Sequence, residues 1–597
     1  MRETPKTLPK LPVPDPKNTL KHFLNFAEAL QTRKDFEETK SVVNDFVEKE
    51  LPTLQKLLEE RAAKLNNWLT PWWLNVAYLE ARAPLPVVTS PGLIFPHFPC
   101  TGKGFQSEYA AKVTQAAVEF HLKVLRGELP QDMFGKTPFD MSQYMFIFGT
   151  TRIPKKGCDK IRYGFANENQ QRHIIVLHNG HVTLITMFNS IIKRSPERLS
   201  HSVGIISSDN RDLWSEVYEQ LKAHPTNSVN LSCIEDALFA VCLDQEFKPS
   251  EGYQEKDEMA RQCLHGGGVK SNACNRWYDK TLQFLIGKNG FVGINYEHTP
   301  AEGPPIATMA DFICDKIFAN DFKDDFTTPE VQVQRLDFEL NDSQKAQIRK
   351  SEKQLDCFIL LAFRVADDLD VAVHTFTRFG KNFPKSVGIS PDSFIQMAFQ
   401  LAFYRIHSTC EFEYLPYLPQ KLFSKAIGIH LSPSHTSIIS LFISMMSILP
   451  IYTGTIIVED IYDALKAAAD SHKNYTLECM NGTGMDRHLL AWNLLAAENG
   501  LAKPSILKTP AYQQMSHFQV STSQVPTRNH LQLGFGPSAP DCYGICYNPQ
   551  ETELHFTITS FKSYGSTNSK RFVKELDRAL DDMNLACSKA TRERSKL

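Results

Sequence analysis

The stretch LQFLIGKNGFVGINYEH, residues 282–298, contains two apolar runs separated by GKNG and ends on a histidine. Short apolar runs favour β-strands, and Gly with Asn between two such runs is typical of a hairpin turn. We therefore expect two antiparallel strands, with His298 just beyond the second one. A rigid strand end can present such a side chain to a cleft.

Helices and strands alternate on both sides of this hairpin. Between about residues 85 and 345, β-rich runs such as RHIIVLHNGHVTLITMF alternate with helical stretches such as SEYAAKVTQAAVEFHLKVLRG, and the alternation returns after about residue 350. Apolar residues at three- and four-residue spacing across residues 18–79 indicate amphipathic helices. We predict an α/β protein with two lobes.

The composition is that of a large globular protein with balanced charge. Of the 597 residues, 42% are hydrophobic and 22% are charged, and 65 basic against 67 acidic residues give a formal net charge of −2. This balance gives no reason to expect nucleic-acid binding. The 13 cysteines show no C-x-x-C pair and no zinc-type His/Cys spacing, which favours a reducing compartment over a disulfide framework. We predict no metal.

The two ends of the chain bear on its location in the cell. The N-terminal stretch MRETPKTLPKLPVPDPKN has neither the apolar core of a secretory signal nor the Arg- and Ser-rich character of a presequence. The last three residues, Ser595, Lys596 and Leu597, spell a tripeptide that peroxisomal import reads. We expect a peroxisomal protein that binds the import receptor through this tripeptide, with a mitochondrial or cytoplasmic location as the alternatives.

The candidate base is His298, which stands between a strand-like run and a loop rich in Pro and Gly. Histidine titrates near neutrality, so it can remove a proton from a substrate hydroxyl. A structural or surface role is the alternative. Glu302, four residues further on, could orient the imidazole or hold a neighbouring cation, or it could be an ordinary solvated carboxylate.

Two further stretches carry groups suited to anions. FGKNFPKSVGISPDSF has Lys381 and Lys385 four residues apart, with Asp392 at the start of a helix; two ammonium groups suit a phosphate-bearing ligand, or simply a solvated surface. STSQVPT has hydroxyl groups at residues 521–523, which could donate to a developing oxyanion or form a polar strand edge. The glycine run in LHGGGVKSN is not a P-loop, and no G-x-S-x-G elbow supports a serine hydrolase.

Taken together, these stretches resemble the carnitine/choline acyltransferase family over nearly the whole chain. The similarity begins at LPKLPVP, continues through NWLTPWWLNVAYLEAR, DMSQYMFIFGTTRIP, the NRWYDKTLQ stretch and YEHTPAEGPP, and ends with FGKNFPKS, DRHLL, STSQVP and FGPSAPDCYGICYNP. It implies two similar lobes, each like chloramphenicol acetyltransferase, with an active-site tunnel between them. The implied divisions are N-terminal helices at 1–85 that pack with the C-terminal lobe, an N-terminal lobe at 86–349 with the catalytic histidine, and a C-terminal lobe at 350–597 with the coenzyme A and carnitine sites.

The reaction that the resemblance implies is reversible transfer of an acyl group between coenzyme A and the hydroxyl of a quaternary amine. His298 would remove the hydroxyl proton in one direction and activate the coenzyme A thiol in the other. Ser523 would stabilise the tetrahedral oxyanion, while Ser521 and Thr522 would line the amine site. Acyl-coenzyme A would be a co-substrate, and we expect no tightly bound cofactor.

The resemblance also implies the remaining binding roles. Lys381 and Lys385 would meet a phosphate of coenzyme A, and Asp392 would contact its pantetheine or adenosine end. Glu302 would be structural and would pair with a nearby arginine, for which Arg276 is the suggested partner.

Substrate choice would depend on three positions. Arg487 in MDRHLLAW matches the family arginine that pairs with the carnitine carboxylate, where choline enzymes have Asn, and Tyr414 matches a tyrosine that contacts the same group. Leu533 in LQLGFGP falls where short-chain members have a bulky residue and longer-chain members have Gly, so it would act as the gate for acyl length. We expect transfer of acetyl to carnitine, with a medium-chain (octanoyl) enzyme as the alternative.

The resemblance stops after Tyr414. Residues 415–458 replace the family stretch GRTDT and its surroundings with an apolar segment that includes SIISLFISMMSILPIYTGTIIV, and the similarity returns near DIYDALKAAADSHKNYT. A shifted reading frame or misread exon is the leading explanation; a divergent insertion and a membrane-anchoring loop are the alternatives, and its Ser, Thr, Pro and Gly content argues against a membrane span. A catalytically impaired relative also remains open. We expect a monomer that binds small molecules and does not insert into a membrane.

Overall fold

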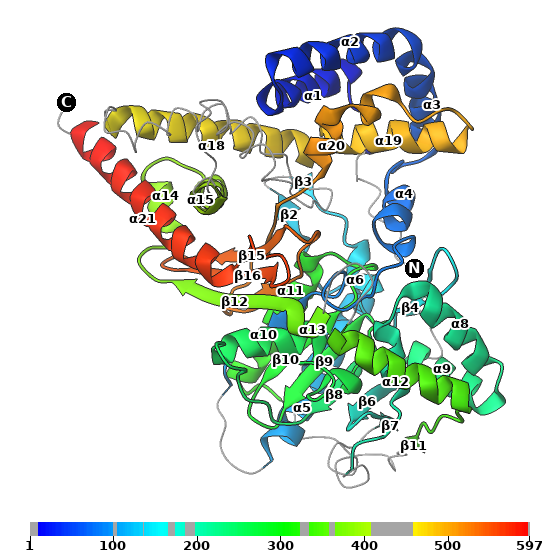
Figure 1. The fold of residues 1–597 in the computed structure, drawn as a ribbon. Helices are drawn as coiled ribbons and strands as arrows, with labels where there is room; N and C mark the ends of the chain where they lie inside the picture. The colour runs from blue at the N-terminus through cyan, green and yellow to red at the C-terminus, as the bar shows by residue number, and fades with distance from the viewer. Residues whose placement is uncertain are drawn as a thin grey trace.

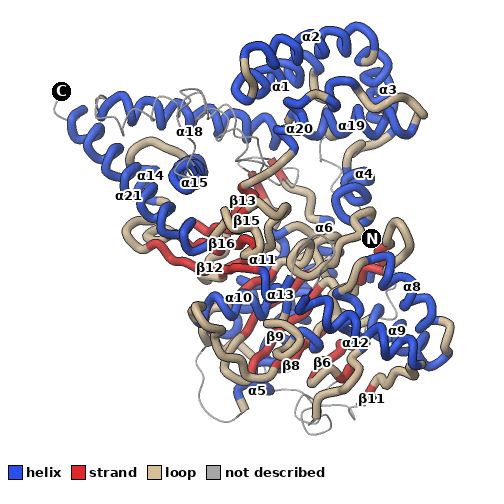
Figure 2. Tube along the Cα trace, viewed as in Figure 1, coloured by secondary structure: helices blue, strands red, loops and turns tan. Residues whose placement is uncertain are grey.

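The computed structural model describes residues 10–98, 104–134, 137–164, 173–185, 197–322, 334–357, 365–407 and 458–594. Tyr414, the aberrant stretch up to residue 457 and the C-terminal Ser595, Lys596 and Leu597 lie outside these residues, so what the sequence predicts for them stays a prediction. The described part contains many helices and two main sheets, which confirms the α/β class (Figures 1 and 2).

The larger sheet has eight strands in the order β11-β7-β6-β8-β9-β10-β1-β14. The predicted hairpin lies inside this sheet: β9 (Leu282–Gly287) and β10 (Val292–Tyr296) pair antiparallel. The other strands are β11 (Gln334–Arg335), β7 (His181–Ile185), β6 (Ile174–His178), β8 (Ala240–Asp244), β1 (Gly92–Ile94) and β14 (Gln532–Gly534). The central strands are apolar on both faces because helices cover both sides.

Successive residues of each strand enter two different cores. On one face, Val176 and Phe284 pack with α5 (Phe105–Arg126) and α11 (Gly303–Phe318). On the other face, Leu177 and Leu285 pack with further helices. These helices are α8 (Arg211–Lys222), α10 (Glu255–His265) and α12 (Asp342–Cys357), with α9 (Pro225–Asp236) beside α8.

The smaller sheet has four strands in the order β12-β16-β15-β13. They are β12 (Leu369–Phe376), β16 (Leu554–Phe561), β15 (Tyr543–Pro549) and β13 (Val520–Gln524), and only β13 joins its neighbour in parallel. Three helices cover one face and share its core, namely α15 (Pro391–His407), α18 (Val458–Met480) and α21 (Ser569–Arg594), with the short α14 (Asn382–Ser386) before α15 (Figure 1).

Strand β14 links the two halves of the chain. It follows β13 in the sequence, yet it pairs with β1 in the larger sheet, with Leu533 opposite Leu93. Its three residues therefore close the open edge of the N-terminal sheet and also pack against β15 and β16 of the smaller sheet. The interface between the lobes is built around this short strand.

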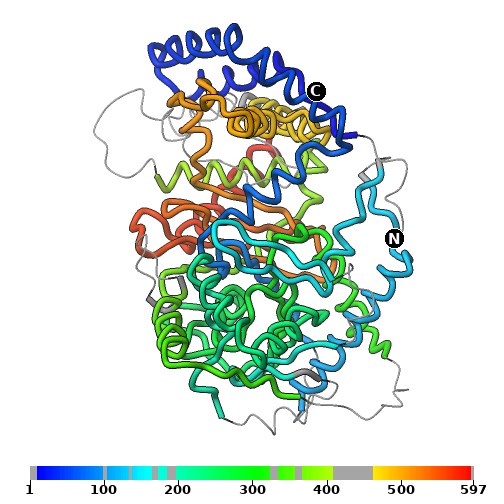
Figure 3. The backbone as a smooth tube through the Cα atoms, turned by 90° about the vertical axis from the view of Figure 1, so that its right-hand side faces the viewer, coloured from blue at the N-terminus to red at the C-terminus, as the bar shows by residue number. Residues whose placement is uncertain are grey.

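The first three helices pack far from the N-terminal sheet. They are α1 (Pro16–Leu30), α2 (Arg33–Lys49) and α3 (Leu51–Lys64), and they share a core with α19 (Met485–Glu498) and α20 (Pro510–Ser516). In Figures 1 and 3 these blue helices lie beside the orange ones. Phe46 and Trp492 pack with ring centroids 5.3 Å apart, and Thr19 Oγ1 lies 2.8 Å from His488 Nδ1.

The chain then descends to the N-terminal lobe through α4 (Thr70–Leu74) and a π-helical turn, Asn75–Leu79 (Figure 1). Short elements complete the described part: β2 (Met133–Phe134), β3 (Thr137–Pro138), α6 (Ser142–Phe146), β4 (Thr151–Ile153), β5 (Lys160–Arg162), α13 (Val365–Asp368) and the 3-10 helices η3 (Val203–Ser208), η4 (Ala273–Asn275) and η6 (Ser505–Lys508). None of the described helices has the length and apolar character needed to cross a membrane.

Candidate active site

His298 is held at the end of β10 by backbone contacts. The strand ends at Tyr296, after which the N–H of Glu297 donates to the carbonyl of Thr281 at 3.0 Å, and the N–H of His298 donates to the carbonyl of Thr89 at 3.1 Å. The side chain of His298 is 20% exposed. The sheet thus fixes the backbone while one edge of the imidazole stays accessible.

Two side chains flank the imidazole of His298. Its Nδ1 lies 2.9 Å from the hydroxyl of Tyr78, and its Nε2 lies 3.5 Å from Glu302 Oε2. The rings of Tyr78 and Tyr296 lie 5.5 and 5.6 Å from the imidazole centroid. An imidazole with one nitrogen held by a phenol and a carboxylate beside the other can take up a proton and stabilise the resulting charge.

Tyr78 comes from the π-helical turn, 220 positions before His298. Burial, together with the negative charge of Glu302 nearby, raises the pKa of Tyr78 well above its usual range, so the phenol stays protonated. No pattern in the sequence singles out Tyr78. Its place in the motif NWLTPWWLNVAYLEAR was the one available signal.

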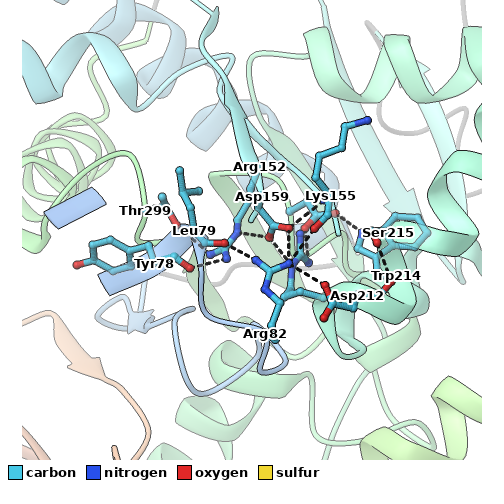
Figure 4. Close-up of polar contacts among 12 residues, drawn as sticks. Tyr78, Leu79, Arg82, Arg152, Lys155, Asp159, Asp212, Trp214, Ser215 and Thr299 are labelled. Atoms are coloured by element: carbon cyan, nitrogen blue, oxygen red, sulfur yellow. Dashed lines mark hydrogen bonds and ion pairs between the residues drawn. The ribbon is translucent and has the colours of Figure 1, made fainter. Parts of the chain in front are cut away.

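A buried arginine joins Tyr78 to the residues on either side of His298 (Figure 4). Arg152 donates through Nη2 to the carbonyl of Tyr78 at 2.7 Å, and through Nη1 to Thr299 Oγ1 at 3.1 Å and Glu297 Oε1 at 3.2 Å. Its Nε donates to Asp159 at 2.7 Å. The side chain of Arg152 is only 1% exposed.

Asp159 extends this network deeper into the lobe. Its carboxylate accepts from Arg211 Nε at 2.7 Å and from Arg82 Nη1 at 3.1 Å (Figure 4 shows Arg82). Burial opposes the charge of Asp159, but Arg211 and Arg152 outweigh it and hold the pKa of Asp159 below its usual range. These residues were not predicted from the sequence either, although Arg152 stands in the motif DMSQYMFIFGTTRIP.

The suggested pair between Glu302 and Arg276 is not formed. Arg276 makes two contacts of 2.7 Å with the carboxylate of Asp244 at the end of β8, and Asp244 raises the pKa of Arg276 although burial opposes its charge. Glu302 precedes α11 and faces His298, and its N–H donates to Gln143 Oε1 at 3.1 Å. Arg276 is thus a structural group of the N-terminal core, and Glu302 belongs to the site.

Arg487 approaches the same region from α19. Its guanidinium stacks over the ring of Trp73 at 3.7 Å, and it interacts electrostatically with Tyr78 and Glu302. A positive charge from the C-terminal half therefore lies near the phenol and the carboxylate that flank His298.

The hydroxyl run lies on β13, where strand alternation separates its members. Thr522 points toward α15 and accepts a hydrogen bond from Gln396 Nε2 at 3.0 Å. Ser521 and Ser523 point to the opposite face, and the buried Ser521 hydroxyl has no hydrogen-bond partner within the described residues. Val525, just past this strand, lies 3.4 Å from where a Cβ on Gly303 would stand, so the strand end meets the start of α11 beside Glu302.

The three coenzyme A candidates lie at the start of the C-terminal lobe. Lys381 precedes α14 and Lys385 lies in it, with Lys385 exposed. Asp392 begins α15, where its carboxylate accepts a hydrogen bond from the Tyr547 hydroxyl and lies 3.2 Å from His472 Nε2. The two lysines can reach a ligand, whereas Asp392 already takes part in a network inside the lobe.

Leu533 is buried on β14 and lines a small cavity between the sheets. Val525, Cys546 and Phe556 share this lining. The cavity measures about 10 Å³, which is room for about one water molecule. The side chains around Leu533 therefore leave little empty space.

The glycine run after α10 forms a tight turn. Residues Gly266, Gly267 and Gly268 all have positive φ, at 70°, 70° and 88°. A Cβ on Gly266 would lie 2.6 Å from the Cα of Ala273, so only glycine fits there. The run is explained by backbone packing and needs no catalytic role.

Comparison with known proteins identifies the kind of enzyme to which this site belongs. The family model "Choline/Carnitine o-acyltransferase" matches residues 11–578. The chain belongs to this family. Members of the choline/carnitine acyltransferase family use acyl-coenzyme A as co-substrate, so this chain is an acyltransferase acting on small molecules.

Individual relatives of this acyltransferase fall into two groups. The chain is 35% identical to the carnitine O-acetyltransferase of Columba livia, over 97% of this chain and 93% of the relative. It is 30% identical to the choline O-acetyltransferase of Danio rerio, over 99% of this chain and 94% of the relative. The solved trichothecene 15-O-acetyltransferase of Fusarium sporotrichioides is similar with a TM-score of 0.34 at 8% identity, covering 83% of this chain and 90% of that one, a likeness too distant to carry an argument.

Proposed function

We propose that this acyltransferase moves an acetyl group reversibly between coenzyme A and the hydroxyl of carnitine, with His298 as the general base. The observation that carries this proposal is the arrangement around one imidazole: Tyr78 on Nδ1, Glu302 beside Nε2 and the cation of Arg487 nearby. Each of these groups has a task in the transfer.

In the proposed reaction, Nε2 of His298 takes the proton of the carnitine hydroxyl while Nδ1 donates to the Tyr78 oxygen. The hydroxyl oxygen then attacks the thioester carbonyl, and the hydroxyl of Ser523 donates to the resulting oxyanion. When the intermediate collapses, the C–S bond breaks and the imidazolium returns its proton to the departing sulfur. Glu302 stabilises the imidazolium between these two steps.

Arg487 supports carnitine over choline as the acceptor. Carnitine carries a carboxylate, and a guanidinium facing a carboxylate forms a charge-assisted pair. Choline offers no such group, and a positive charge near its quaternary amine would repel it. The preference therefore rests on one side chain.

Leu533 supports a short acyl group. With the leucine in place, the cavity behind it measures only about 10 Å³. An octanoyl chain would have to displace the side chains that line this space. Lys381 and Lys385 support coenzyme A as the donor, since both ammonium groups stand on one short segment that a phosphate can approach.

The test is carnitine-dependent release of thiol from acetyl-coenzyme A by purified protein. His298→Ala should lower the rate at least about 100-fold, because general base catalysis contributes about that much or more. A variant that melts like the wild type yet keeps normal turnover would sink the mechanism.

Arg487→Asn tests the acceptor separately. It should raise the KM for carnitine about tenfold to 100-fold, the worth of a hydrogen bond to a charged group, and leave the KM for acetyl-coenzyme A unchanged. Leu533→Ala should raise octanoyl turnover relative to acetyl turnover. Binding of coenzyme A without any carnitine-dependent thiol release would instead favour the impaired relative that residues 415–458 suggest.

A further inference from the structure

Two histidines and a glutamate converge on one point beside β14, and one of them, His555, also lines the small cavity at Leu533. His530 lies in the loop between β13 and β14, Glu553 in the turn between β15 and β16, and His555 near the start of β16. Glu553 Oε1 lies 3.1 Å from His530 Nδ1 and 2.8 Å from His555 Nε2, and the two nitrogens are 3.2 Å apart. No other group of three such ligands is found among the described residues.

Hydrogen bonds alone cannot satisfy this triangle. An ionised carboxylate oxygen only accepts, and each imidazole nitrogen either donates or accepts. Each of the three atoms acts either as a donor or as an acceptor, so at least two of them act in the same way. At least one of the three contacts therefore joins two donors or two acceptors and is not a hydrogen bond. A cation at the centre removes the conflict, because it needs all three atoms as electron-pair donors.

The distances also suit a small divalent cation. Zinc bonds to His nitrogen and carboxylate oxygen are about 2.0–2.2 Å long, which puts neighbouring donor atoms about 2.8–3.1 Å apart at the 90° angle of octahedral coordination and about 3.3–3.6 Å apart at the tetrahedral angle. The three separations here run from 2.8 to 3.2 Å. Two imidazoles and one carboxylate are ligands that Zn²⁺ and its neighbours in the first transition row accept.

The surrounding structure holds the ligands in place. The loop of His530 is fixed because the N–H groups of Arg528 and Asn529 donate to Asp311 at 2.9 and 3.0 Å. The other nitrogen of His555, Nδ1, lies 3.1 Å from the side-chain nitrogen of Gln532 and 3.3 Å from Thr375 Oγ1, and the threonine oxygen can accept a hydrogen bond from the Nδ1–H of a ligating imidazole. The ligating side chains are therefore already held in position for a cation.

We propose that His530, Glu553 and His555 form a binding site for one divalent transition cation of the Zn²⁺ type. The His555 side chain is 5% exposed and the His530 side chain is 58% exposed, so the site is open on one side and leaves further coordination positions to water. The cation would tie the β13–β14 loop to the β15–β16 turn. The proposal does not depend on the acyl-transfer reaction.

The turn that carries Glu553 also touches the segment with the coenzyme A candidates. The N–H of Lys381 donates to the carbonyl of Gln550 at 2.8 Å, and a Cβ on Gly380 would stand only 2.4 Å from the backbone nitrogen of Glu553. Binding of a cation would accordingly make the segment that carries Lys381 more rigid.

The experiment is a titration of full-length protein, stripped with a chelator and then freed of it, with Zn²⁺ in a calorimeter. We expect one equivalent to bind, and we expect His530→Ala and Glu553→Gln each to weaken binding at least about tenfold. The matched control is His517→Ala, which removes another exposed histidine paired with a carboxylate, here Asp541 at 2.8 Å. It should bind like the wild type.

A second measurement uses thermal melting. Zn²⁺ should raise the Tm of the wild type and of His517→Ala but not that of His530→Ala, because only a cation held by the folded state stabilises it. The proposal is overturned if the wild type binds no Zn²⁺, or if His530→Ala and Glu553→Gln bind it as tightly as the wild type and His517→Ala do.

Discussion

The two lobes supply the site in different ways. In the N-terminal lobe, His298 lies two residues past the end of β10, and the buried Arg152 binds Tyr78, Glu297 and Thr299 around it. In the C-terminal half, Arg487 rests on an aromatic ring, and the buried Ser521 hydroxyl has no partner among the described residues. His298 is thus rigidly supported, whereas the Ser521 hydroxyl keeps its hydrogen-bonding capacity for a ligand.

Replacing Arg152, which holds the residues around His298, should have the largest effect on the unfolding free energy. Arg152→Met keeps the volume but leaves the fully buried Glu297 without its cation, which should cost about 3–5 kcal/mol of unfolding free energy. Chemical denaturation measures this loss. The matched control, Arg578→Met in the C-terminal lobe, removes an exposed pair with Glu575 and should cost less than about 1 kcal/mol. Equal losses of unfolding free energy in the two variants would contradict the view that the support around His298 is especially important for stability.

Low pH should reduce the unfolding free energy through His488, which is buried in α19. Burial lowers the pKa of His488 from 6.5 to about 3, so the folded state holds this histidine neutral while the unfolded chain protonates it. Its contribution to stability is therefore present above pH 6.5 and is lost as the pH falls. One pKa unit corresponds to about 1.4 kcal/mol, so up to about 3 kcal/mol should disappear between pH 7 and pH 4.5.

His488→Gln separates this effect from general acid denaturation. Glutamine can keep a hydrogen bond with Thr19 but does not titrate. The unfolding free energy of the variant should depend less steeply on pH than that of the wild type. An unchanged pH dependence would assign the loss to other groups.

Tyr78→Phe sharpens the comparison by removing only the contact with His298 Nδ1. One hydrogen bond is worth about 1 kcal/mol, so kcat should fall between about twofold and tenfold while the KM for acetyl-coenzyme A stays unchanged. Steady-state kinetics with carnitine as acceptor measures both. A kcat equal to that of the wild type would show that the phenol does not hold the imidazole.

The smallest effect is expected at Thr522 in the C-terminal lobe. Thr522→Val removes the hydrogen bond from Gln396, so the unfolding free energy should fall by about 1 kcal/mol. Because this side chain points away from the face of Ser521 and Ser523, the KM for carnitine should not change. A raised KM would mean that Thr522 meets the amine after all.

Local patterns in the sequence predicted the local structure well. The turn GKNG between apolar runs led to the hairpin β9–β10, and three- and four-residue spacing led to α1, α2 and α3. Period-two alternation would also have separated Thr522 from Ser521, because neighbours on a strand face opposite ways. The resemblance assigns both hydroxyls to the amine site, and that assignment stays a prediction.

Long-range contacts could not be predicted in the same way. No pattern links Tyr78 to His298 across 220 positions, and β14 is too short to show a period. The predicted ion pair between Glu302 and Arg276 is wrong because opposite charge alone does not determine which two groups pair. Asp244 stands where both guanidinium nitrogens can reach its carboxylate at once, and that depends on the register of β8 and β9.

Strand β14 has a consequence for how the protein is made. The ribosome delivers β1 early, but the strand that covers its free edge begins only at Gln532. Throughout most of translation that edge therefore exposes unpaired backbone groups, which can pair with another nascent chain. Release of a chain truncated before residue 532 should accordingly yield a species that needs a chaperone or aggregates, even though nearly all of its N-terminal core is present.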